Sequence, residues 1–147
     1  MMMRMALPVI LMAPLLGLTQ TPSSGGETTV ALAPFVVVSD SAGTLRATAN
    51  DCLEHLASAL KARGITVARH ESLTDKTISR ARPAALAVLG EFRKEKGIIQ
   101  VALRLMDVST GDELRSYFHG SADPREIASM GTAVADRIVK YMREKSG

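Results

Sequence analysis

Aromatic residues are scarce in this sequence of 147 residues. Tryptophan is absent, and two tyrosines and three phenylalanines bring the aromatic share to only 3%. Hydrophobic residues nevertheless make up 46% of the chain, so the core must be built mainly from leucine, isoleucine, valine, alanine and methionine. Proteins that bind single-stranded nucleic acid stack the bases on aromatic rings. The scarcity of rings therefore argues against that class of function.

Cysteine is rarer still, since Cys52 is the only one. A single cysteine cannot form an intramolecular disulfide, so the fold must depend on its packed core. Cys52 lies among apolar residues at helical spacing. This favours a small buried side chain over a redox-active thiol, because a reactive thiol needs exposure and a basic neighbour.

The sequence also lacks the common catalytic motifs. It contains no G-x-S-x-G, no G-x-x-x-x-G-K and no G-x-G-x-x-G. The histidines, His55, His70 and His119, lie in different segments without the paired spacing of metal ligands. We therefore expect a non-enzymatic protein without a cofactor or a metal site.

Neither sign of charge dominates. The formal net charge is +3, and it falls to +2 if a leader that carries Arg4 is removed. A value so close to zero gives little support for a polyanionic partner, and we expect no nucleic acid. The most basic stretch is either a docking surface, for an acidic partner or an anionic envelope polymer, or solvated surface charge. It comprises Arg80, Arg82, Arg93, Lys94 and Lys96.

Long hydrophobic runs are absent except near the amino terminus. Residues 5–18 are apolar and follow Arg4, and residues 19–26 are small and polar, which is the order of a secretory signal peptide. The run is shorter than the roughly 20 residues that span a bilayer. We expect a signal peptide and flexible tether over residues 1–26, one domain over residues 27–147, and a periplasmic or secreted mature protein. Membrane contact is expected only through an uncleaved leader, because no cysteine follows the run to carry a lipid.

The domain is organised around residues 84–120, which predict three consecutive strands. Residues 85–92 are nearly all apolar, as in a strand covered on both faces. From residue 98 onward, apolar and polar residues alternate, as in a strand with one buried face. Residues 113–119 predict a shorter, more polar strand at a sheet edge. Three of its residues are expected to share one face: Leu114, Ser116 and Phe118.

Two further strands and a helix precede this core. Residues 29–39 are β-branched and apolar, with Pro34 marking a bulge or a strand end. A helix with one apolar face is expected from Thr44, as N-cap, to Gly64, as the stop. Residues 65–69 predict a short strand parallel to the first.

Two more helices complete the prediction. Residues 72–82 predict a short helix that ends at a proline. The last helix opens with Asp123 as N-cap and Pro124 at the first helical position, and Glu126 is expected to close a capping box. The order β-α-β-α-β-β-β-α predicts a three-layer α/β/α fold with a five-stranded mixed sheet and helices on both faces.

At this point four stretches resemble a known family: VALAPFVVVSDS, LASALKARGITV, ARPAALAVLGEF and VALRLMDVSTGDELRS. Together they are similar to the TolB amino-terminal-like superfamily, which includes related domains of CsgG, FlgO and LpoB-type envelope proteins. The likeness covers about residues 29–142 and includes the Pro34-Phe35 pair. It implies the strand order 2-1-3-4-5, an architecture shared with anticodon-binding domains, and an envelope setting. The matching residues build a fold and a turn, and they do not form an active site.

Two functions follow as hypotheses. In the first, an exported envelope protein binds another, unidentified protein through the sheet edge at residues 113–119 or the hairpin tip at residues 91–97. The alternative is a small-molecule-binding or sensory module of the periplasm, with a crevice near residues 39–44 and 70–74. The candidate binding residues are Arg93, Lys94, Lys96, Arg115 and Tyr117.

Overall fold

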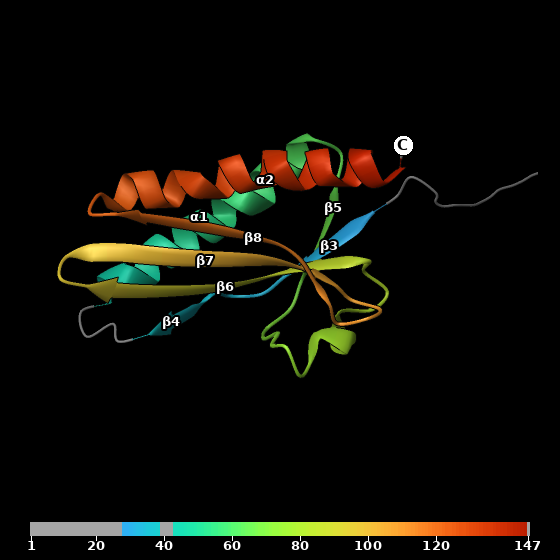
Figure 1. The fold of residues 1–147 in the computed structure, drawn as a ribbon, viewed down its shortest axis with the longest axis horizontal. Coiled ribbons are helices and arrows are strands. Elements are labelled where there is room, and N and C mark those ends of the chain that lie inside the picture. Colours follow the sequence, from blue (N-terminus) through green and yellow to red (C-terminus); the bar gives the residue numbers. More distant parts are fainter. Residues whose placement is uncertain (1–27, 39–42, 147) are drawn as a thin grey trace, which may run out of the picture.

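The computed structural model describes residues 28–38 and 43–146 (Figure 1). The expected leader at residues 1–26 lies outside these ranges, as do residues 39–42 of the predicted crevice. The elements in chain order are β3 (Thr29–Leu32), β4 (Val36–Val38), α1 (Thr44–Ala62), β5 (Thr66–Arg69), the 3-10 helix η3 (Ile78–Ala81), β6 (Leu86–Glu95), β7 (Ile98–Asp107), β8 (Glu113–Ser121) and α2 (Pro124–Ser146).

The strands form one mixed sheet in the order β5-β3-β6-β7-β8, with β4 continuing the line of β3 beside β6. The pairs of β3 with β5 and with β6 are parallel, whereas β6 with β7 and β7 with β8 are antiparallel. This is the strand order that the resemblance implied. The α/β class and the mixed sheet are confirmed. The sheet lies between a thick layer, made by α1 and α2, and a thinner one, made by the chain between β5 and β6.

The predicted first strand is divided at Pro34, as expected from a residue that cannot donate to a sheet ladder. β3 ends at Leu32 and β4 begins at Val36, so both segments pair with β6 on either side of the break. Phe35 turns into the core at the break and stacks on Phe92, with ring centroids 5.6 Å apart. Gly90 leaves room for the ring, because a Cβ there would lie 2.5 Å from Phe35 Cδ1.

Both long helices cover the same face of the sheet, which we call the helix-covered face (Figure 1). Thr44 is the first helical residue of α1 and not its N-cap, so the predicted N-cap is wrong by one residue. Gly43 takes the N-cap position, with φ 80° and no side-chain cap. It ends as predicted at Gly64. The Gly64 and Ile65 N–H groups donate to Lys61 and Leu60, which is a Schellman motif.

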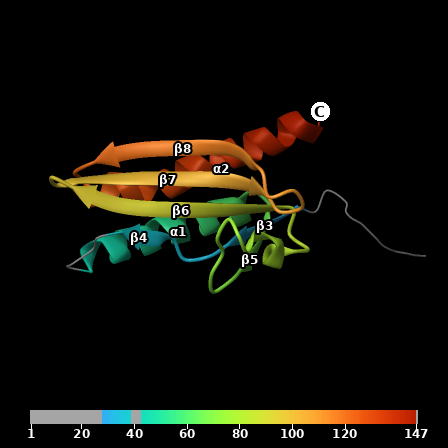
Figure 2. The same ribbon diagram turned by 60° about the horizontal axis from the view of Figure 1, so that its bottom comes forward.

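Within the described residues, the opposite face is covered at one end and not at the other (Figure 2). There the chain between β5 and β6 packs Leu73, Ile78 and Ala81 against strand residues such as Ala87 and Leu89. The helix predicted for residues 72–82 is wrong in extent, since only Ile78–Ala81 is helical and the turn is of the 3-10 type. A segment this polar lacks the apolar stripe that would hold a full helix on a sheet.

A bulge in β8 changes one predicted face. The ladder pairs Leu105 with Arg115 but Met106 with Glu113, so Leu114 is the extra residue and packs toward the helix-covered core. The prediction that Leu114 and Phe118 share a face is therefore wrong. An inserted residue reverses the alternation on one side of it, and the pattern of a single strand does not reveal this.

The start of α2 is confirmed, with a different partner for its glutamate. Asp123 Oδ1 accepts from the Arg125 N–H at 2.9 Å, which is the expected cap, and Pro124 is the first helical residue. Glu126 does not close a capping box. Its carboxylate lies 2.6 Å from Nε2 of His119 on β8, because the strand passes directly beside the helix start.

Candidate functional site

The part of the second sheet face that the β5–β6 connection leaves uncovered carries an unusual row of side chains. The register places Val36, Glu91, Ala102 and Phe118 side by side across four strands. Phe118 is 73% exposed and Val36 is 52% exposed, and Ile98 nearby is 40% exposed. We call this area, from Val36 to Phe118 and down to Ile98, the open face. No described element packs over it.

Small residues make a depression in the open face beside Phe118. Ala102 and Gly120 line it together with Arg93 and Gln100. The depression has a volume of about 640 Å³. A Cβ on Gly120 would lie 3.7 Å from its nearest neighbours, which is an ordinary van der Waals contact, so the position would accept a small side chain without a clash. An open depression of this kind suits a partner's side chain better than it suits an enclosed small molecule.

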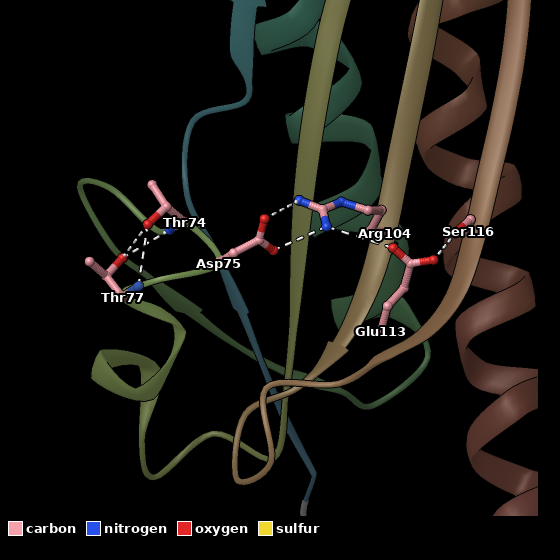
Figure 3. A network of polar contacts seen from close by, with 6 residues as sticks. All are labelled: Thr74, Asp75, Thr77, Arg104, Glu113 and Ser116. Carbon is pink, nitrogen blue, oxygen red and sulfur yellow. Dashed lines mark hydrogen bonds and ion pairs between the residues drawn. The ribbon is translucent and has the colours of Figure 1, made fainter.

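A polar network borders the open face at the covered end (Figure 3). The Arg104 guanidinium on β7 lies 3.0 Å from Asp75 in the β5–β6 connection and 3.6 Å from Glu113 on β8. Asp75 lies between Thr74 and Thr77 in the sequence, and the hydroxyl groups of these two threonines lie 3.2 Å apart beside it. The hydrogen bond to Asp75 is the main cause that raises the pKa of Arg104. The network fastens the connection to the sheet.

The outer side of β8 is the second feature of this region. β8 pairs with β7 alone among the described strands, so its other edge has no strand partner. α2 runs beside it (Figure 1). A groove of about 570 Å³ separates the two. We call this the β8–α2 groove. Its lining residues are Arg115, Ser116, Tyr117, Asp136, Arg137, Lys140, Tyr141 and Glu144.

Cations predominate among the side chains that are available in the β8–α2 groove. The Arg115 guanidinium lies over the Tyr141 ring, 4.7 Å from its centroid, and also donates to the Leu114 carbonyl at 2.8 Å. Asp136 is occupied by an ion pair with Arg63. Within the described residues, Arg137 and Lys140 have no carboxylate at ion-pair distance.

Tyr117 forms the apolar wall of the groove on the strand side. It is half-buried against the helix-covered core. Burial raises the pKa of its phenol, and the Arg115 and Arg137 guanidinium groups act in the opposite direction. The phenol is therefore neutral at physiological pH and available as a hydrogen-bond donor beside two cations.

The five residues proposed from the sequence do not form one site. Arg115 and Tyr117 lie together in the β8–α2 groove, whereas Arg93 lies on the open face in an ion pair with Glu91. Lys94 and Lys96 belong to the β6–β7 hairpin end, where Lys96 has φ 52° in the turn.

The basic stretch is also divided. Arg80 lies in η3 and Arg82 directly follows it, shortly before the start of β6. Arg93 lies near the other end of β6, a strand of ten residues, and about 24 Å along it from Leu86. Side chains on successive residues of β6 also point to opposite faces. A single basic surface is therefore not formed.

Sequence reasoning missed the helix side of the groove. In the sequence, Arg137 and Lys140 are cations toward the carboxyl end of the last predicted helix, and Tyr141 follows its apolar positions at helical spacing. No spacing rule connects them to Arg115, because β8 and α2 meet through tertiary packing. The exposure of Phe118 was missed for a related reason. It depends on how far the β5–β6 connection extends over that face of the sheet, which is also set by tertiary packing.

A small cavity lies where β3 breaks. It has a volume of about 280 Å³ and is lined on one side by Pro34 and on the other by Thr74 and Asp75 of the β5–β6 connection. This position overlaps the predicted crevice near residues 70–74. The other predicted part, residues 39–42, lies outside the described residues.

The described residues contain no group of three or more histidine, cysteine or acidic side chains that could hold a metal ion. Cys52 is buried, as predicted. None of the helices that the structure describes is both long enough and apolar enough to cross a membrane.

Comparisons with known proteins locate the fold by structure and not by sequence. No family model matches the chain, and no curated protein matches its sequence. Among solved structures, the L103M variant of PelC from Paraburkholderia phytofirmans, described as a dodecamer, superposes with a TM-score of 0.54 at 17% identity. That match covers 78% of this chain and 88% of PelC.

Two further structures are similar. Protein XCC0632 from Xanthomonas campestris gives a TM-score of 0.55 at 9% identity, over 82% of this chain and 88% of that one. TolB from Acinetobacter baumannii gives 0.52 at 15% identity, over 80% of this chain but only 29% of TolB. The resemblance to a TolB-type domain is thus confirmed at the level of the fold, and identities this low establish the fold alone.

Proposed function

We propose that this protein is a non-enzymatic, exported protein of the cell envelope whose single domain binds another protein along strand β8. The observation that carries the proposal is Phe118, which is 73% exposed in the middle of an edge strand. A large ring on a strand that has no outer partner is typical of a contact surface, because such edges are otherwise shielded.

The two edges of the sheet differ in a way that favours β8. The opposite edge strand, β5, has only four residues (Thr66–Arg69), whereas β8 has nine (Glu113–Ser121). A strand added to β8 would gain a ladder of backbone hydrogen bonds along this length. Its side chains would point alternately toward the open face and the β8–α2 groove.

The envelope setting is supported by two separate observations. The leader-like residues 1–26 have the order of a signal peptide, and the fold is similar to that of TolB. The absence of catalytic motifs from the sequence supports a binding role. The partner is an envelope protein that is reached after export.

Site-specific cross-linking tests this proposal. A photoreactive phenylalanine analogue at position 118 should attach to a discrete partner in intact cells. The same analogue at Asn50, an exposed position on α1, should not. A product of twice the chain's mass would identify the partner as a second copy, as in an oligomer like the PelC dodecamer. Equal labelling from both positions, or none from 118, would contradict the proposal.

The cavity at the break in β3 supports a second candidate, a small-molecule-binding or sensory module. Its volume of about 280 Å³ suits only a small ligand, since typical ligand pockets begin near about 300 Å³. A ligand at about 100 times its Kd stabilises a protein by about 2.7 kcal/mol, which thermal unfolding detects. No shift in Tm across a panel of small metabolites would count against this candidate.

A further inference from the structure

The side chains that line the β8–α2 groove indicate the chemistry of the partner. We propose that β8 accepts an acidic, extended peptide in which carboxylate and apolar side chains alternate. This inference rests on the proposed function and adds the identity of the side chains that β8 selects.

The first step is geometric. A strand paired to β8 must alternate its side chains between the two faces of the sheet. On one face its nearest neighbour is Phe118, beside the depression above Gly120. On the other face the neighbours are Arg115 and Tyr117, which line the groove with α2. One strand therefore meets two different environments at alternate residues.

The second step is electrostatic. Arg115, Arg137 and Lys140 line the groove. Of the two carboxylates there, Asp136 already pairs with Arg63, which leaves Glu144 against three cations. Charge complementarity favours carboxylates on the side of the strand that faces the groove, because arginine binds carboxylate through charge-assisted hydrogen bonds.

The third step concerns how the cations are held. The Arg115 guanidinium lies over the Tyr141 ring and bonds to the Leu114 carbonyl, so it is directed along the edge of β8. A guanidinium fixed in this way loses less conformational freedom when it binds a carboxylate than one that is free in solvent. The open face offers the opposite environment, with an exposed ring and small residues that fit an apolar side chain against Phe118.

Three labelled peptides of about the length of β8 test the inference directly. One alternates aspartate with valine, the second lysine with valine, and the third threonine with valine. Fluorescence anisotropy with the purified protein at low ionic strength should show at least about tenfold tighter binding of the aspartate peptide. The preference should fall in about 1 M salt, where the Debye length is about 3 Å.

Charge reversal supplies the matched control. Arg137→Glu should weaken binding of the aspartate peptide by about tenfold and strengthen binding of the lysine peptide. Lys76→Glu makes a charge reversal of the same sign at an exposed position in the β5–β6 connection, and it should change neither affinity. Circular dichroism of each variant verifies that the fold is retained. Equal effects of the two variants would overturn the inference.

The remaining outcomes separate this inference from the proposed function. If the threonine peptide binds as well as the aspartate peptide and Phe118→Ser weakens both, strand addition holds and the acidic preference is wrong. If no peptide binds while cross-linking from position 118 succeeds, the inference also falls and protein binding stands. If no peptide binds and position 118 forms no cross-link, both this inference and the proposed function are overturned.

Discussion

At the scale of single residues, glycine sets the distance between the two helices. A Cβ on Gly131 would lie 2.2 Å from the Cys52 carbonyl oxygen and 2.8 Å from the Leu56 nitrogen. Both are backbone atoms of α1, so no side-chain rotation could relieve the clash. The helices therefore meet backbone to backbone at this point. Because Gly131 has no side chain, α2 can lie this close to α1.

Gly131→Ala should consequently destabilise the protein by about 1–3 kcal/mol, as overpacking does in other cores. The change gains about 1 kcal/mol of helix propensity, which the clash must exceed. Urea unfolding measures the difference. Thr132→Ala, at the exposed neighbouring position, is the control and should be close to neutral. A stabilising effect of Gly131→Ala would contradict the close approach of the helices.

Cys52 lies at the same helix contact, and its thiol should be inert. Burial raises the pKa of Cys52 from 9.0 to about 12, against a smaller effect of a hydrogen bond with the Gly131 backbone. The thiolate is the reactive form, so at pH 8 this rise lowers its fraction by about a thousandfold. A disulfide reagent should therefore label the native protein at least about a thousandfold more slowly than the urea-unfolded protein. Comparable rates would show that the thiol is accessible.

At the scale of elements, the turn between β7 and β8 positions the edge strand. Asp107 Oδ1 accepts from the Ser109 N–H at 2.8 Å, the Ser109 hydroxyl at 2.7 Å and the Thr110 N–H at 3.1 Å. Gly111 then takes φ 80°, which lets the chain reverse. The turn thus sets where β8 begins, and the bulge at Leu114 follows three residues later.

Asp107→Ala should destabilise the protein by about 0.5–1.5 kcal/mol at pH 7, the usual range for hydrogen bonds that remain partly exposed. The hydrogen bond from Ser109, followed by those from Thr110, lowers the pKa of Asp107 below 3.8. This stabilisation is therefore present above about pH 3.8 and is lost as pH falls through the native pKa. The difference between wild type and variant in urea unfolding should shrink as the pH falls below about 3.8. A difference independent of pH would contradict the role of the carboxylate.

At the scale of the whole molecule, the two faces of the sheet are covered unequally. α1 and α2 pack over one face along its length, whereas in the part of the chain that the structure describes the other face has the β5–β6 connection alone, at one end (Figure 2). The boundary of the open face is fixed where Arg104 joins Asp75 to Glu113 (Figure 3). The extent of the candidate site therefore depends on how firmly this connection is held.

Arg104→Ala should loosen the connection without unfolding the sheet. Trypsin should cleave after Lys76 and Arg80 several times faster than in the wild type, because local opening exposes these bonds. Arg82 precedes Pro83, and trypsin does not cut there. Arg93→Ala removes another ion pair from the same face, with Glu91, and should leave the cleavage rate unchanged. Equal rates for wild type and Arg104→Ala would show that apolar packing alone holds the connection.

The sequence by itself determined the elements whose signals are local. The alternation from Ile99 to Leu105 identified the buried face of β7, and Pro34 identified the break in the first strand. Gly64 and Asp123 gave a helix end and a helix start through the geometry of their own backbones and side chains. These features depend on residues within about one turn or one strand of each other, so a linear pattern contains them.

Only the tertiary structure decided which surfaces stay open. The bulge at Leu114 places Phe118 outside the core, and the packing of α2 beside β8 places Arg137 and Lys140 next to Arg115. The β5–β6 connection covers one end of a face and leaves the other uncovered. Each of these depends on contacts between segments far apart in the chain, whose energies are set by packing and desolvation and leave no fixed spacing in the sequence.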